Sequence, residues 1–158
     1  MTQAPALLFV CLGNICRSPL AEGAMRLAAE QAGLDVKIDS CGTASYHVGE
    51  PPDPRSIATA AAHGIDISDL RGRQLQRVDF SRFTNVFAMD HQNLRNIEAV
   101  RPADSTARVS LLMDVVSGRE GAAIADPYYG GEDGFMDTWR DVSDAAASIA
   151  AQLVDGRW

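Results

Sequence analysis

Residues 7–20 read LLFVCLGNICRSPL, and the expected fold of the chain follows outward from this stretch. The apolar run at residues 7–10 predicts a short buried strand. Ser18 is a favourable N-cap and Pro19 suits the first helical position, so we expect a helix that begins here and ends at Gly33. The stretch therefore predicts a strand, a tight loop and a helix.

The loop between this strand and helix has the composition of an oxyanion site. Backbone N–H groups that turn inward, together with the positive end of a helix, bind a tetrahedral anion. Cys11 would lie at the floor, where these groups favour the reactive thiolate, and Arg17 offers a planar fork for two phosphate oxygens. A buried strand-end cysteine and an accidentally spaced surface arginine are the alternative. The strand before, Gly13-Asn14 within and the helix start after make that coincidence a poor explanation.

Residues 10–19, VCLGNICRSP, resemble the signature of the low-molecular-weight protein tyrosine phosphatases. A second block, residues 126–130 (DPYYG), occurs where that family places its general acid, and the resemblance covers nearly the whole chain. It implies an α/β fold of one domain, residues 1–158, with a four-stranded parallel sheet of order 2-1-3-4 and helices on both faces. The pattern alone does not give that strand order.

The rest of the chain alternates strand and helix signals. Further strands are expected at 36–40, 84–89 and 108–113, helices at 55–63, 91–100 and 134–153, and an irregular connection at 68–76. Alternation of this kind indicates a parallel sheet covered on both faces, in which ligands bind at the carboxyl ends of the strands.

The resemblance also implies an activity: hydrolysis of phosphotyrosine and small aryl phosphates through a phospho-cysteine on Cys11. Arg17 would bind phosphate and Asp126 would act as general acid and base, although an Asp-Pro pair often only begins a turn. Asn14, Ser18 and Ser40 match polar family positions that hold the loop in shape through a network of hydrogen bonds. A histidine that many relatives have near the end of this network has no clear match here. The residues expected to contact substrate are Leu12, Gly13, Asn14, Ile15, Cys16, Ser18, Tyr46, His47, Tyr128 and Tyr129.

Tyr46 stands where many members carry Trp, which predicts a smaller pocket wall and a changed substrate preference. Phosphotyrosine on a protein, such as a tyrosine kinase, is the expected substrate, while a sugar phosphate or phosphoarginine would fit the same loop. Ile15 matches the variant associated with tyrosine phosphatases and favours the first. Cys16 either fills space or captures an oxidised Cys11 as a disulfide, which would make the enzyme redox-sensitive.

Composition narrows the function classes further. The net charge of -7 argues against nucleic acid or an anionic membrane as partner. Three cysteines are too few for a disulfide framework, and no signal peptide or membrane span is recognisable, so we expect a cytoplasmic monomer. No metal or cofactor is expected, since no Cys/His spacing suggests a metal site.

The sequence argues against three rival functions. An arsenate reductase on this fold would need two further cysteines downstream, and none follows Cys41. A non-catalytic phosphate-binding module would be expected to lack Cys11 or Asp126. A P-loop nucleotidase is excluded by the absence of a Gly-x-x-x-x-Gly-Lys motif.

Overall fold

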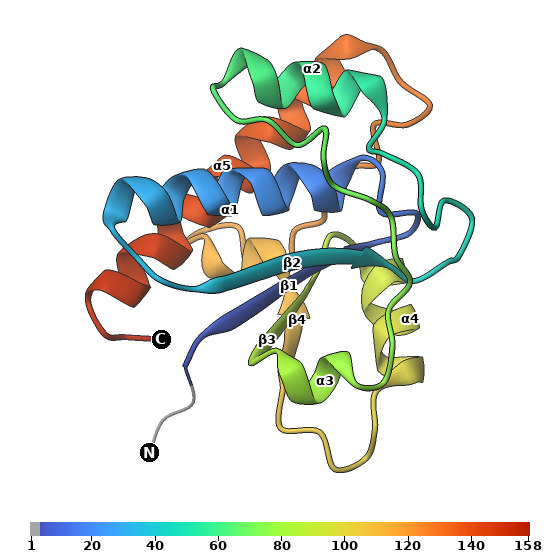
Figure 1. Ribbon diagram of the computed structural model, residues 1–158. Helices are drawn as coiled ribbons and strands as arrows, with labels where there is room; N and C mark the ends of the chain where they lie inside the picture. Colours follow the sequence, from blue (N-terminus) through green and yellow to red (C-terminus); the bar gives the residue numbers. More distant parts are fainter. Residues whose placement is uncertain (1–3) are drawn as a thin grey trace.

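A computed structural model describes residues 4–158 of the chain as a four-stranded parallel sheet between two layers of helices (Figure 1). The strands, in spatial order, are β2 (Lys37–Gly42), β1 (Ala6–Cys11), β3 (Asn85–Ala88) and β4 (Arg108–Leu111). All three neighbouring pairs are parallel. The predicted order 2-1-3-4 is confirmed, and the carboxyl ends of all four strands share one edge.

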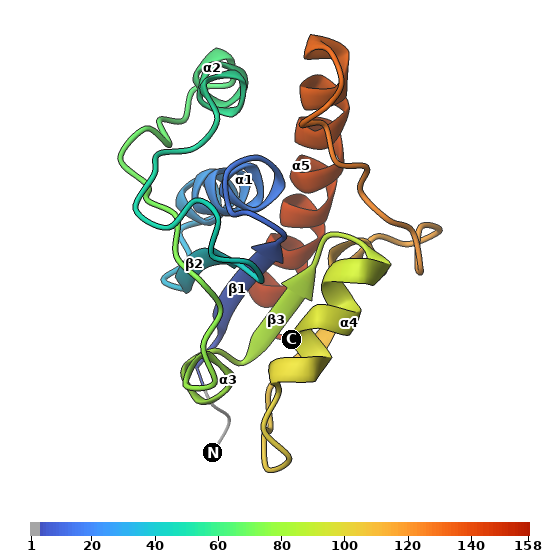
Figure 2. The ribbon, with the colours of Figure 1, turned by 90° about the vertical axis from the view of Figure 1, so that its right-hand side faces the viewer.

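Two apolar cores form because successive side chains of β1 point to opposite faces of the sheet. Leu7 and Phe9 join the core under α1 (Arg17–Ala32) and α5 (Glu132–Val154). Leu8 and Val10 join the core on the other face, under α3 (Asp79–Arg82) and α4 (His91–Val100). Figure 2 shows α1 and α5 on one side of the sheet and α4 on the other, with α2 (Pro54–Ala62) outside α1.

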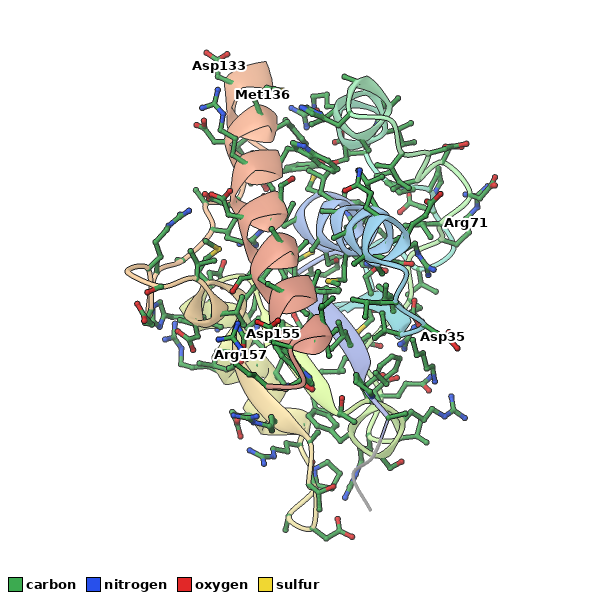
Figure 3. The ribbon with its side chains drawn as sticks, turned by 90° about the vertical axis from the view of Figure 1, so that its left-hand side faces the viewer. Asp35, Arg71, Asp133, Met136, Asp155 and Arg157 are labelled. Atoms are coloured by element: carbon green, nitrogen blue, oxygen red, sulfur yellow. The ribbon has the colours of Figure 1, made fainter. Side chains whose placement is uncertain are left out.

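The last helix, α5, is amphipathic in the way a core-covering helix requires. Phe135, Trp139 and Val142 lie on its buried face. Figure 3 shows Asp133 and Met136 near its first turn and Asp155 beyond its end, all projecting away from the core. Among the described residues, no helix combines the length and apolar character needed to cross a bilayer.

Several predicted boundaries need correction. The N-cap position of α1 is Cys16, without a side-chain hydrogen bond, so the prediction of Ser18 as N-cap and Pro19 as first helical residue was wrong. The Ser18 hydroxyl faces the loop instead, where buried polar partners outcompete a local cap. Gly33 does end the helix, in the left-handed conformation that glycine allows.

The remaining differences are at element ends. The fourth strand ends at Leu111, and the next residues form a 3₁₀ helix, η1 (Leu112–Val115). Strand β2 continues through Cys41-Gly42, which were expected to begin a loop. Helix α3 was not predicted, because four residues are too few to show a helical period.

Candidate active site

The loop at residues 12–16 joins the carboxyl end of β1 to the first turn of α1, and Asn14 holds its shape from within. Asn14 has a left-handed φ of 58°, which asparagine tolerates better than most residues. Its Nδ2 donates to Ser18 Oγ at 2.8 Å and to Ser40 Oγ at 3.0 Å, and its Oδ1 accepts the Arg73 N–H at 3.1 Å. Both N–H donors and the oxygen of this buried amide are therefore used to fix the loop.

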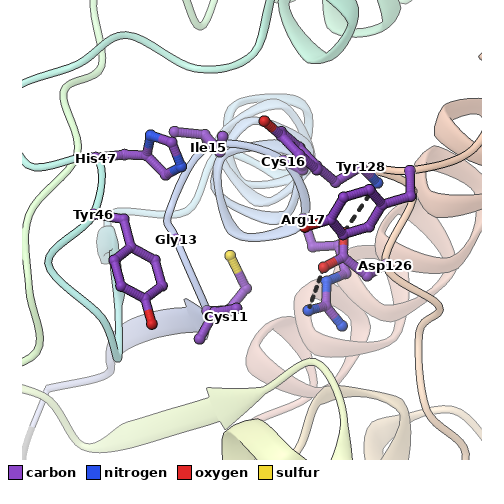
Figure 4. A pocket seen from close by; sticks show the side chains of 11 residues that line it. Cys11, Gly13, Ile15, Cys16, Arg17, Tyr46, His47, Asp126 and Tyr128 are labelled. Carbon is purple, nitrogen blue, oxygen red and sulfur yellow. Dashed lines mark hydrogen bonds and ion pairs between the residues drawn. The ribbon is translucent and has the colours of Figure 1, made fainter.

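Cys11 is the last residue of β1, and its sulfur opens into the hollow that the loop encloses (Figure 4). The side chain is buried, and Sγ lies 3.0 Å from Ser18 Oγ, where either atom can donate. A serine hydroxyl can thus stabilise a thiolate at this position by donating to it.

Arg17 begins α1 and is held firmly on one edge of its guanidinium. Nη1 donates to Asp90 Oδ2 at 2.6 Å and to the Ile124 carbonyl at 2.9 Å, while Nη2 lies 3.6 Å from Asp126 Oδ2. Nε is buried and has no hydrogen-bond partner among the described residues. A buried N–H donor without a partner is costly, so this edge of the fork is suited to receive an anion.

A cavity of about 190 Å³ opens above Cys11. It is lined by Cys11, Leu12, Gly13, Ile15, Cys16, Arg17, Tyr46, His47, Asp126, Tyr128 and Tyr129. Asn14 and Ser18, which were predicted to contact substrate, are absent from this lining. Both side chains are buried, and their mutual hydrogen bond supports the loop from the side away from the cavity.

Asp126 lies across the cavity from the loop (Figure 4). Its Oδ1 accepts the Tyr128 N–H at 3.0 Å, and its side chain is 40% exposed, so a proton can reach it from solvent. Arg55 contacts this segment from α2: its guanidinium donates to the Tyr128 and Gly130 carbonyls and lies 4.5 Å from the centre of the Phe135 ring.

The mouth of the cavity is aromatic and exposed. Tyr46 and Tyr129 are 73% and 92% exposed, and the Tyr128 and Tyr129 rings meet edge to face at 4.9 Å. His47 lies beside Gly13 and Ile15 of the loop (Figure 4), with Nδ1 at 2.7 Å from Glu50 Oε2. Rings at the mouth can contact a planar leaving group.

Cys16, the last residue of the loop, has a buried thiol. Burial raises the pKa of the Cys16 thiol to about 12, and the negative charge of Asp53 adds to the effect. Cys16 is therefore a neutral thiol at physiological pH. Behind the loop, burial also raises the pKa of Glu22, against hydrogen bonds from Ser40 and Arg26.

Sequence reasoning missed two residues that shape the site. Asp90 follows the third expected strand, on the edge where ligands were expected to bind, but it was given no role; in the structure it holds Arg17 by an ion pair. Arg55 was not considered. A carboxylate at a strand end on the ligand-binding edge was the available signal for Asp90. Within residues 4–158, no group of three or more His, Cys, Asp and Glu side chains could hold a metal ion.

Comparisons with known proteins agree with this geometry. The family model described as low molecular weight phosphotyrosine protein phosphatase matches residues 6–156. A protein of that description from Schizosaccharomyces pombe is 47% identical, over 97% of this chain and 99% of its own length.

Solved structures are similar over most of their length. The crystal structure of a protein tyrosine phosphatase from Entamoeba histolytica has a TM-score of 0.91 at 34% identity, covering 98% of this chain and 100% of that one. The crystal structure of an arginine phosphatase from drosophila has a TM-score of 0.87 at 31% identity, covering 93% and 96%.

Proposed function

This chain belongs to the low molecular weight phosphotyrosine protein phosphatase family, and we propose that it hydrolyses phosphotyrosine and small aryl phosphates. The observation that supports the proposal most strongly is the Arg17 guanidinium beside Cys11. One of its edges is bound by Asp90 and Ile124, whereas the buried Nε has no partner among the described residues.

In the proposed reaction, the Cys11 thiolate attacks phosphorus as the bond to the leaving oxygen breaks. Asp126, protonated, gives its proton to that oxygen, and a phospho-cysteine forms. The Asp126 carboxylate then takes a proton from water, which attacks phosphorus and releases inorganic phosphate and the free thiolate. Arg17 and the loop N–H groups stabilise the charge on the equatorial oxygens throughout.

The aromatic residues at the mouth of the cavity favour phosphotyrosine, with its aryl leaving group, over phosphoarginine, with its flexible guanidinium group. Tyr46, Tyr128 and Tyr129 are placed where they could contact a phenyl ring, and Ile15 lines the same cavity. Similarity to an arginine phosphatase makes phosphoarginine the second candidate. We propose that the substrate is a phosphotyrosine protein, such as a tyrosine kinase, and that the enzyme acts as a cytoplasmic monomer; its three cysteines are free thiols, as a reducing compartment would allow.

The deciding experiment compares turnover of phosphotyrosine, phosphoserine and phosphoarginine peptides by the purified protein and by Cys11→Ser. We expect phosphotyrosine to be preferred, and the serine variant to bind phosphate while turning over nothing. Near-normal activity of Cys11→Ser would contradict covalent catalysis, and a preference for phosphoarginine would reassign the substrate.

We also propose that the site is redox-sensitive. Peroxide would oxidise the Cys11 thiolate to a sulfenic acid, and attack by the Cys16 sulfur would expel water and form a disulfide that thiols reduce. Because Cys16 has a pKa of about 12, capture should be slow at neutral pH and accelerate as pH rises. After peroxide, wild type should recover activity on thiol addition much better than Cys16→Ser. Equal recovery would leave Cys16 with a packing role only.

A further inference from the structure

A short segment outside the cavity, residues 72–75, contacts both the loop at residues 12–16, which we call the phosphate loop, and the wall of the site that carries Tyr46 and His47. We call this segment the strap. It follows α2 and passes the carboxyl end of β2 on its way to α3 (Figure 1). Its isolated bridge pairs Gln74 with Gly42, and the Gly42 N–H and carbonyl bond to Arg73 and Leu75. The strap is thus a short addition to the sheet at its ligand-binding edge.

On one side a backbone N–H of the strap bonds to the phosphate loop. The Arg73 N–H donates to Asn14 Oδ1 at 3.1 Å. Asn14 is the left-handed residue of that loop, and its other side-chain bonds go to Ser18 and Ser40. A shift of the Arg73 backbone would therefore move Asn14 and change the conformation of the phosphate loop.

On the other side the strap contacts the wall that carries Tyr46 and His47. The Gly49 N–H donates to the Gly72 carbonyl and the Gly72 N–H donates to the Glu50 carbonyl, each at 2.8 Å. A Cβ on Gly72 would lie 2.3 Å from the His47 carbonyl oxygen, a distance that no side chain can occupy. The wall and the strap are in backbone contact, so only glycine permits their spacing.

The strap is held in place by the Arg73 side chain, which points away from the cavity. Its guanidinium forms two bonds with the buried Asp79, at 3.1 and 3.0 Å, and its Nε donates to Asp39 at 3.1 Å. Asp79 Oδ2 also accepts the Gln76 N–H at 2.8 Å. A bidentate arginine–carboxylate pair of this kind fixes orientation as well as distance.

We propose that Arg73 is a positioning residue for this site. Asp79 and Asp39 hold the Arg73 side chain, which fixes the strap. The strap in turn sets the separation between the phosphate loop and the wall that carries Tyr46 and His47. Arg73 acts on phosphate affinity through Asn14, and Gly72 acts on aryl-group recognition through His47. Only the part about aryl-group recognition rests on the proposed function, because phosphate binding can be measured without turnover.

The test uses Arg73→Met, Gly72→Ala and the matched control Arg71→Met. The exposed Arg71 side chain bonds to the Ser68 and Leu70 carbonyls and points to solvent (Figure 3). The readouts are the dissociation constant of inorganic phosphate by calorimetry, KM for phosphotyrosine, and the melting temperature. Arg73→Met should weaken phosphate binding about fivefold, which corresponds to losing the hydrogen bond between the backbone N–H of residue 73 and Asn14. The control should stay within about twofold of wild type. Gly72→Ala should change KM at least about threefold and leave phosphate affinity within about twofold.

Each outcome is decisive. A lower melting temperature with phosphate affinity and KM both unchanged would show a merely structural role and overturn the proposal. If Arg73→Met does not fold, Arg73→Lys keeps the charge, loses the fork, and is held to the same phosphate readout. A wild-type protein that binds phosphate but cleaves no aryl phosphate would refute the proposed function, while the calorimetric comparison would still decide the role of Arg73.

Discussion

Replacing Asp90 by serine should separate the orientation of Arg17 from the stability of the fold. Asp90 uses its two oxygens differently: Oδ1 accepts the Asn93 N–H at 2.7 Å as the N-cap of α4, and Oδ2 accepts from Arg17 at 2.6 Å. Serine caps a helix about as well as aspartate but is too short to reach Arg17. Arg17 would keep its 2.9 Å bond to the Ile124 carbonyl and its 3.6 Å ion pair with Asp126.

The magnitude follows from the bond that is lost. A hydrogen bond between charged groups contributes about 1.5–3 kcal/mol, and each 1.36 kcal/mol changes a rate tenfold, so kcat/KM for aryl phosphates should fall by roughly 10- to 150-fold. Steady-state turnover measures the loss, and thermal unfolding should show a change of only a few degrees. Asp66→Ser is the control, because Asp66 likewise accepts a backbone N–H, that of Ser68, but is exposed and has no bond to Arg17 among the described residues. A value of kcat/KM within about twofold of wild type would refute the reasoning that Asp90 orients Arg17.

Two further predictions concern ionisable groups. Asp126→Ala should lower kcat by about 10²–10⁴-fold for esters with poor leaving groups and much less for acidic phenols, because only the former need a proton; a loss independent of leaving group would instead indicate a structural role. Glu22→Gln should flatten the pH dependence of stability. Burial raises the pKa of Glu22 in the folded state, so its favourable contribution is complete below the ordinary value of 4.5 and is lost as pH rises through the raised value. Denaturant unfolding of wild type should weaken over that range more than unfolding of the glutamine variant, and parallel curves would contradict the assignment.

The sequence was informative where local pattern and tertiary environment agree. The apolar run of β1 and the helix ended by Gly33 have periods that are visible in isolation, so both were predicted. Ser18 was misassigned because its hydroxyl could either cap the helix or form hydrogen bonds with Cys11 and Asn14. The folded structure shows the second arrangement.

The family resemblance predicted the bonds of Asn14 to Ser18 and Ser40, but other long-range polar pairs could not be predicted, for a related reason. Arg17 and Asp90 are 73 positions apart, and Asn14 meets the Arg73 amide across 59. No periodicity specifies which of many carboxylates or backbone amides will face a given donor after folding. The strand order of the sheet came from family resemblance, since alternation alone is compatible with several orders.

The contacts of Arg55 have a consequence for the timing of catalysis. By binding the Tyr128 and Gly130 carbonyls from α2, Arg55 ties the segment that carries Asp126 to a helix of the folded body. The conformational entropy of ordering that segment is therefore lost when the protein folds, before any substrate arrives. In the proposed reaction, Asp126 is therefore already in place to donate a proton, and no lid has to close first.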